Sequence, residues 1–180
     1  MHLSMFFLAY ECKLIMIFYY KVIFTNCFLS FRIEDRDNEE RVALMNILVI
    51  DAQGGGIGRQ IVSAISSKLP DMTITAVGTN TVATSAMLKA GADTGATGEN
   101  AVIVGARKAD VIIGPIGIVV ADSLLGEITP DMAKAVGQSD AKRILIPVNH
   151  CDNVVVGIRD TSIKGLVEEV LTELQNFSGQ

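Results

Sequence analysis

The sequence predicts an α/β fold: a three-layer, doubly wound parallel sheet with helices on both faces. Three observations predict it. Short apolar runs alternate with helix-forming segments, a glycine-rich turn follows the first run, and polar residues follow several of the runs. Such alternation is typical of a parallel sheet. A glycine turn after the first strand places that strand centrally, so the expected strand order is 3-2-1-4-5 with a sixth strand at the edge.

The first half of the expected domain supplies three strands and two helices. Residues 45–51 are apolar and rich in β-branched side chains, which is typical of a strand buried on both faces. The next helix ends at Pro70, and its apolar positions recur every four residues: Ile57, Ile61, Ile65 and Leu69. Residues 72–77 predict the second strand, 79–90 a helix that Gly91 ends, and 92–96 a short third strand.

The second half is predicted in the same way. Residues 99–108 indicate a helix, although 101–104 are equally compatible with a strand. A fourth buried strand and its turn occupy 111–117, and the apolar segment 116–127 is expected to continue as a helix. Pro130 begins another helix. Strands at 143–148 and 154–158 follow, and residues 161–174 form a closing amphipathic helix capped by Thr161 or Ser162.

Residues 1–44 differ in composition from the rest. All 16 glycines and all four prolines lie at or after Gly54, whereas nine of the ten aromatic residues lie in the first 31. The codons of Glu39, Glu40 and Arg41 can form a purine run just before Met45, as a bacterial ribosome-binding site would. We therefore expect a single domain at 45–180 that begins at Met45, with 1–44 as upstream sequence that does not pack on it.

A membrane anchor is the alternative for the same segment. Residues 14–31 are long enough to cross a bilayer, but Lys21, Thr25 and Asn26 lie inside the stretch. A signal peptide fits less well, because a small-residue cleavage site is missing and Glu11 interrupts the basic start. The expected location is the cytoplasm, or the membrane if 14–31 is inserted.

Charge and cysteine content exclude several classes of function. The formal net charge is −5 and the isoelectric point is near 5.0, which argues against a general nucleic-acid binder. The three cysteines form no CxxC or Cys/His cluster, so neither a disulfide framework nor a zinc site is indicated.

The glycine turn carries the main functional prediction, a Rossmann-like nucleotide site. Strand, glycine turn and helix together present backbone N–H groups and a helix N-terminus to an anion. The turn does not match GxGxxG or the Walker pattern, and it differs from the deviant-Walker loop because Gly54 and Arg59 replace both lysines. The expected phosphate-binding residues are Gln53, Gly54, Gly55, Gly56, Ile57, Gly58 and Arg59. The alternative is a turn that only packs the helix against the strand.

The end of the second strand bears on the choice of nucleotide. A NAD site carries Asp or Glu there for the ribose hydroxyls, whereas this chain has Thr79 and Asn80 and no acid between Asp71 and Asp93. NADP is therefore favoured over NAD, with another nucleotide as the alternative. The competing interpretation is that Thr79 or Asn80 only caps the next helix. Gly114 and Pro115, at the end of the fourth strand, complete the expected site.

His150 and Cys151 lie side by side in the loop after the fifth strand. Adjacent side chains tend to point apart, so a catalytic Cys–His pair is not expected. No catalytic residue is assigned.

The segment from Met45 resembles a family of short bacterial proteins known as domain of unknown function 3842. The resemblance is carried by VIDAQGGGIGRQIV, ITAVGTNTVATSAMLKAGAD, GATGENAV, DVIIGPIGIVVADSLLGEITP and ILIPVN, covers residues 45–174, and excludes the first 44. It implies a Rossmann-like fold and no established activity. The family pattern has Gly where this chain has Ala52.

Two functions from different classes remain open. One is a nucleotide-binding domain, with a small NADP-linked oxidoreductase as its enzymatic form. Residues 45–180 contain no tyrosine, so the YxxxK mechanism of short-chain dehydrogenases is excluded. The other is a ligand sensor or interaction module without chemistry. The expected partner is a phosphate-bearing small molecule, and a homodimer is expected because the apolar helix at 116–128 needs cover on more than one side.

Overall fold

The computed structural model describes residues 45–148, 155 and 162–178 of the chain. The strands in this part are β1 (Asn46–Asp51), β2 (Thr73–Gly78), β3 (Thr94–Thr97), β4 (Val111–Pro115) and β5 (Lys142–Ile146). The helices are α2 (Gly56–Lys68), α3 (Thr81–Lys89), α4 (Glu99–Ala106), the 3-10 helix η1 (Ile116–Val119), α5 (Pro130–Gly137) and α6 (Ile163–Ser178).

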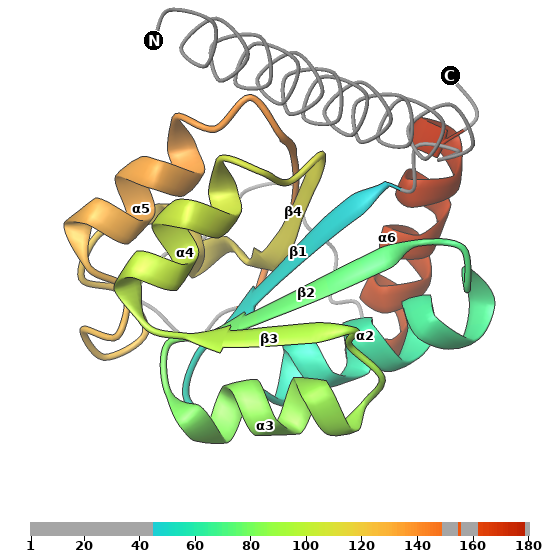
Figure 1. Ribbon diagram of the computed structural model, residues 1–180, viewed down its shortest axis with the longest axis horizontal. Coiled ribbons are helices and arrows are strands. Elements are labelled where there is room, and N and C mark those ends of the chain that lie inside the picture. Colours follow the sequence, from blue (N-terminus) through green and yellow to red (C-terminus); the bar gives the residue numbers. More distant parts are fainter. Residues whose placement is uncertain (1–44, 149–154, 156–161, 179–180) are drawn as a thin grey trace, which may run out of the picture. The chain divides into compact units, whose positions relative to one another are not determined.

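The sheet confirms the predicted topology. Its order is β3-β2-β1-β4-β5, and every neighbouring pair is parallel (Figure 1). The chain therefore winds first to one side of β1 and then to the other, which creates a topological switch point between β1 and β4. The predicted sixth strand apart from residue 155, His150, Cys151, and the predictions for residues 1–44 lie outside the described residues.

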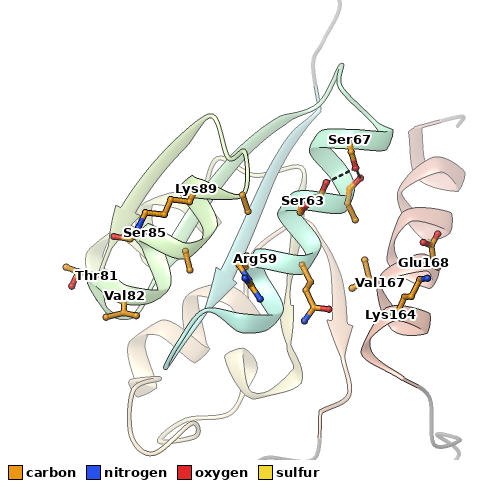
Figure 2. A pocket seen from close by; sticks show the side chains of 14 residues that line it. Arg59, Ser63, Ser67, Thr81, Val82, Ser85, Lys89, Lys164, Val167 and Glu168 are labelled. Atoms are coloured by element: carbon orange, nitrogen blue, oxygen red, sulfur yellow. Dashed lines mark hydrogen bonds between the residues drawn. The ribbon is translucent and has the colours of Figure 1, made fainter.

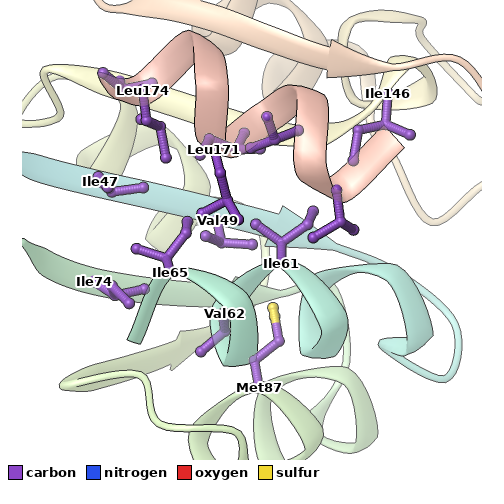
Figure 3. Packing of buried hydrophobic residues seen from close by; sticks show 14 of the residues in the cluster. Ile47, Val49, Ile61, Val62, Ile65, Ile74, Met87, Ile146, Leu171 and Leu174 are labelled. Atoms are coloured by element: carbon purple, nitrogen blue, oxygen red, sulfur yellow. The ribbon is translucent and has the colours of Figure 1, made fainter. Parts of the chain in front are cut away.

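Two apolar layers hold the helices on the sheet. On one face, side chains of β1 and β2 pack against α2, α3 and α6 through Ile61, Ile65, Met87, Leu171 and Leu174 (Figure 3). On the other face, Leu48, Ile50 and Ile112 pack against α4, η1, α5 and the segment between η1 and α5. β1 is buried on both faces from Ile47 to Asp51, as its continuous apolar sequence predicts.

The helix ends follow the capping residues of the sequence. Asn80 Oδ1 accepts hydrogen bonds from the N–H groups of Val82 and Ala83 at the start of α3, and Thr129 Oγ1 accepts from Met132 N in α5. Ser162 Oγ accepts from Gly165 N at the start of α6, which confirms one of the two predicted caps. Gly91 has a positive φ of 111° just after α3, the conformation expected of a C-terminal stop.

The segment after β4 corrects a prediction. The expected helix over 116–127 is confined to η1, and φ is positive at Asp122, Leu124, Leu125 and Gly126. The chain folds back on itself instead: Ser123 Oγ donates to Gly117 O at 2.6 Å, and Asp122 N donates to Ile128 O at 2.8 Å. Three of the apolar residues of this segment, Ile118, Leu124 and Ile128, are buried in this domain's own core, whereas Leu125 is exposed. The reason given for a homodimer is thereby removed.

Candidate functional site

The glycine turn joins β1 to α2 at the carboxyl edge of the sheet. Gln53 and Gly55 have positive φ values of 52° and 65°, and Gly55 N donates to Ala52 O at 3.0 Å. Two left-handed residues so close together reverse the chain within four positions, so that α2 begins at Gly56.

No helix among the described residues is long and apolar enough to span a bilayer.

The glycines of this turn have two different roles. A Cβ at Gly55 would lie 2.7 Å from Ala83 Cα, and one at Gly58 would lie 2.5 Å from Met87 Sδ and 2.8 Å from Asp51 Cβ. These two glycines therefore permit close packing of α2, α3 and β1. A Cβ at Gly54 or Gly56 would have no neighbour within 4 Å, and both residues are exposed. Their absent side chains leave open space beside the start of α2.

Asp51, the last residue of β1, is a buried carboxylate under this turn. Its Oδ1 accepts from Ala52 N at 2.8 Å, and its Oδ2 accepts from Gly58 N at 2.7 Å. Burial raises the pKa of the Asp51 carboxyl; the backbone N–H groups of Gly58, Ala52 and Ile57 oppose the rise, and the charge of Glu127 adds to it. Asp51 therefore ties β1 to the first turn of α2.

Glu127 is a residue of this candidate site that the sequence did not predict. Its Oε2 accepts hydrogen bonds from Gln53 N at 3.0 Å, from Asn80 Nδ2 at 2.9 Å and from Thr79 Oγ1. Partial burial alone would raise the pKa of Glu127, but the bonds from Thr79, Gln53 and Asn80 outweigh it, so the pKa lies below its ordinary value. One carboxylate thus joins the segments after β1, β2 and β4.

Only the sheet order could have pointed to Glu127. It lies 74 residues from Gln53 and 48 from Thr79 in sequence, and an apolar segment surrounds it. A parallel sheet of order 3-2-1-4-5 nevertheless brings the segments that follow β1, β2 and β4 to one edge. Of the residues expected to bind phosphate or sugar, the structure brings Gln53, Thr79 and Asn80 together on this carboxylate.

The remaining predicted residues are distributed around the turn. Ile57 is half-buried and packs against the core beneath α2. Gly114 and Pro115 are buried within β4, and a Cβ at Gly114 would lie 2.4 Å from Ile50 O, so this glycine permits close approach to β1. Arg59 is exposed, and its side chain lines a groove on the helical face of α2.

That groove runs over α2 between α3 and α6 and encloses about 910 Å³ (Figure 2). Its floor is built from small side chains of α2 and α3, including Ser63, Ala64 and Ser85. The cations on its lining are Arg59, Lys89 and Lys164, and its acid, Glu168, is paired with Lys68 at 2.7 Å. The groove is thus separate from the Glu127 contacts and locally positive.

No cluster of three or more metal-binding side chains occurs among the residues that the structure describes. The polar groups around the glycine turn include backbone N–H groups, the carboxylates of Asp51 and Glu127, the Thr79 hydroxyl and the Asn80 amide.

Comparison with known proteins identifies the family of the chain. No curated protein matches the chain. Among solved structures it is similar to the crystal structure of a dodecameric, FMN-dependent UbiX-like decarboxylase from Escherichia coli O157:H7. The identity is 16%, the TM-score is 0.43, and the match covers 76% of this chain and 96% of that chain. Residues 46–178 match the family that the motifs of the sequence resemble, and the chain therefore belongs to the family described as Domain of unknown function (DUF3842).

Proposed function

We propose that residues 45–180 form a domain that binds a phosphate-bearing nucleotide at the turn between β1 and α2. The observation that carries the proposal is the open space at Gly54 and Gly56, where an added Cβ would meet no atom within 4 Å. Glycine in a turn that needs no room for packing is typical of a site that a ligand's phosphate approaches closely.

The donors for the phosphate are the backbone N–H groups of Gly54 and Gly56. Within the described part of the chain, neither group donates to a protein acceptor, whereas Gln53 N and Gly58 N are bonded to carboxylates. The partial positive charge at the start of α2 adds to these donors. Asp51 lies under the turn and Glu127 at its β2 side, so the phosphate is expected on the exposed side at Gly54–Gly56.

Arg59 supplies the nearest cation in sequence. It lies in the first turns of α2, three residues after Gly56, and its side chain is exposed. Turning back toward the turn, the guanidinium would add a charge-assisted hydrogen bond to the phosphate. Arg59→Ala should therefore weaken nucleotide binding about tenfold, or roughly 1.4 kcal/mol.

A glycine-to-valine pair tests the site. Gly56→Val fills the proposed phosphate space, while Gly137→Val places the same side chain in open space at the end of α5. Isothermal titration calorimetry with NAD(H), NADP(H), ATP, GTP and sugar phosphates should show nucleotide binding by the parent and by Gly137→Val. Gly56→Val should be folded, with a native circular dichroism spectrum, and should bind none of them.

Two results would overturn the proposal. One is a folded Gly56→Val protein that binds every nucleotide as the parent does. The other is a parent that binds none of the compounds, in which case the interaction-module interpretation takes its place.

The preference for NADP over NAD loses its basis in the sequence. That expectation depended on a missing acid at the end of β2, and Glu127 brings a carboxylate into contact with Thr79 and Asn80. The proposal is therefore a nucleotide whose phosphate lies at the glycine turn, with enzymatic activity left open.

The cationic groove favours an interaction module as the second candidate function. Val82 is 64% exposed at its rim, and Arg59, Lys89 and Lys164 line it although the chain is acidic overall. Such a surface suits an acidic segment of a partner. Fluorescence anisotropy with a labelled oligoglutamate peptide should show salt-sensitive binding to the parent and none to Ser63→Glu, which fills part of the groove and adds a negative charge to it. Equal binding by both would reject this candidate.

A further inference from the structure

We infer that Glu127 is the specificity residue of the proposed nucleotide site. The geometry points to a carboxylate that accepts hydrogen bonds from the hydroxyls of an unphosphorylated ribose. The ligand class is then nucleotides with a free 2′-hydroxyl, and nucleotides with a 2′-phosphate are rejected. This inference rests on the proposed function and adds the choice among nucleotides to it.

The position of Glu127 is the first argument. In doubly wound sheets the ribose lies at the end of the second strand, where an acid binds its hydroxyls. Here that strand ends in Gly78, and the residues after it are Thr79 and Asn80, both in direct hydrogen-bond contact with Glu127. The carboxylate thus reaches this place from the segment after β4, across the switch point, instead of from β2 itself.

The second argument is that the two carboxylate oxygens of Glu127 differ in their hydrogen bonds. The bonds from Gln53 N, Thr79 Oγ1 and Asn80 Nδ2 all fall on Oε2. Within the described residues, Oε1 accepts no hydrogen bond, and Glu127 is only partly buried. Three donors therefore fix the carboxylate while its second oxygen remains available to a hydroxyl donor. A fixed acceptor loses little freedom when a ligand binds.

The charge at this position is the third argument. A 2′-phosphate carries up to two negative charges, and it would face Glu127 with Asp51 close behind. Among the described residues, no lysine or arginine forms an ion pair with Glu127. Glu127 therefore repels a 2′-phosphate, while a neutral hydroxyl gains an acceptor.

The backbone that carries Glu127 is the fourth argument. Asp122, Leu124, Leu125 and Gly126 precede it with φ values of 61°, 54°, 61° and 80°. Left-handed leucines are uncommon, since their side chains crowd the backbone. The strained backbone is held by the bonds from Ser123 to Gly117 and from Asp122 to Ile128. Strain of this kind persists where the surrounding structure enforces it, and it clusters at functional sites.

The test compares ligands that differ at one position of the ribose. NAD+ and NADP+ differ by the 2′-phosphate, and ADP and 2′-deoxy-ADP differ by the 2′-hydroxyl. Isothermal titration calorimetry of the parent should show at least tenfold tighter binding of NAD+ than of NADP+, and of ADP than of 2′-deoxy-ADP. Glu127→Gln keeps the shape of the side chain and removes its charge, so it should reduce both preferences to less than threefold.

Asp122→Asn is the matched control. It removes one negative charge from the same segment, but Asp122 is exposed and lies five residues away from Glu127 in sequence. The preferences of Asp122→Asn for NAD+ over NADP+ and for ADP over 2′-deoxy-ADP should equal those of the parent. A thermal melt of each variant establishes that differences in binding do not arise from unfolding.

The outcomes separate the two proposals. The role of Glu127 is overturned if the parent binds NADP+ as tightly as NAD+, or if Glu127→Gln keeps the preferences of the parent. In either case, loss of nucleotide binding in Gly56→Val would still support the nucleotide site. The role of Glu127 is also overturned if the Glu127→Gln variant binds all four ligands and inorganic pyrophosphate more tightly than the parent does. Glu127 would then be an internal competitor for the phosphate. Failure of the parent to bind any of the four overturns the proposed function and this inference with it.

Discussion

Gly58 and Asp51 are in mutual contact at the junction of α2 and β1. Gly58 N donates to Asp51 Oδ2 at 2.7 Å, and a Cβ on Gly58 would lie 2.8 Å from Asp51 Cβ. The hydrogen bond and the close approach depend on each other, since a side chain at 58 would push the helix away from the carboxylate. The junction is thus specified by one glycine and one acid.

Gly58→Ala should destabilise the domain by about 1–3 kcal/mol, because the methyl group overpacks the space against Met87 and Asp51. Urea denaturation followed by circular dichroism measures the change. Gly137→Ala is the control: nothing lies within 4 Å of its Cβ, and alanine is the better helix former, so stability should be unchanged or slightly higher. Equal effects of the two substitutions would contradict the close approach at Gly58.

Asp51→Asn should also destabilise the domain, by about 1–3 kcal/mol at pH 7. Both oxygens of Asp51 accept backbone N–H groups, whereas an asparagine has one acceptor oxygen and turns its NH2 group toward the other donor. Urea denaturation followed by circular dichroism measures this loss of stability, with Asp122→Asn at an exposed position as the reference. Burial raises the pKa of the Asp51 carboxyl, so its charge is unfavourable at this position. If Asp51→Asn is as stable as the parent, removal of this charge offsets the lost acceptor.

The contribution of Glu127 should depend on pH in one direction. Its folded-state pKa lies below the ordinary value of 4.5, so the hydrogen-bonded carboxylate stabilises the fold fully above that pH. This stabilisation is lost as the pH falls through the folded-state pKa. The parent should therefore exceed Glu127→Gln in stability by a constant amount between pH 6 and 8, about 0.5–1.5 kcal/mol because the carboxylate is only partly buried, and by less below 4.5. A difference that grows on acidification would contradict the assignment.

The neighbouring Leu124 and Leu125 should respond differently to the same truncation. Leu124 is 7% exposed and belongs to the core, whereas Leu125 is 92% exposed, and both have left-handed φ values. Leu124→Ala should cost about 2–4 kcal/mol and Leu125→Ala less than about 0.5 kcal/mol, as judged by thermal and urea unfolding. Similar losses at both positions would contradict the burial of Leu124 and the exposure of Leu125.

The fold was predictable because its information is local. The alternation of strands and helices, the glycine turn, and the caps at Asn80, Thr129 and Ser162 are each visible within about a dozen residues. The contact of Glu127 with Gln53 and Thr79 is not local, and it depends on which segments the sheet order brings together. The prediction of a helix over 116–127 is wrong for a related reason. Apolar residues in an irregular segment give the same pattern as a helix, and left-handed leucines have no signature in sequence.

The winding of the sheet also sets the order in which the domain can assemble during synthesis. β1, β2 and β3 are contiguous in the sheet and emerge first, but the opposite side of β1 pairs with Val111–Ile113 of β4. The backbone of Ile47–Val49 on that side therefore stays unpaired until more than sixty further residues have left the ribosome. Late closure of this kind slows folding and exposes an apolar edge to other nascent chains. The central strand, which is buried on both faces in the finished protein, is thus the one that a ribosome-bound chaperone would need to shield for longest.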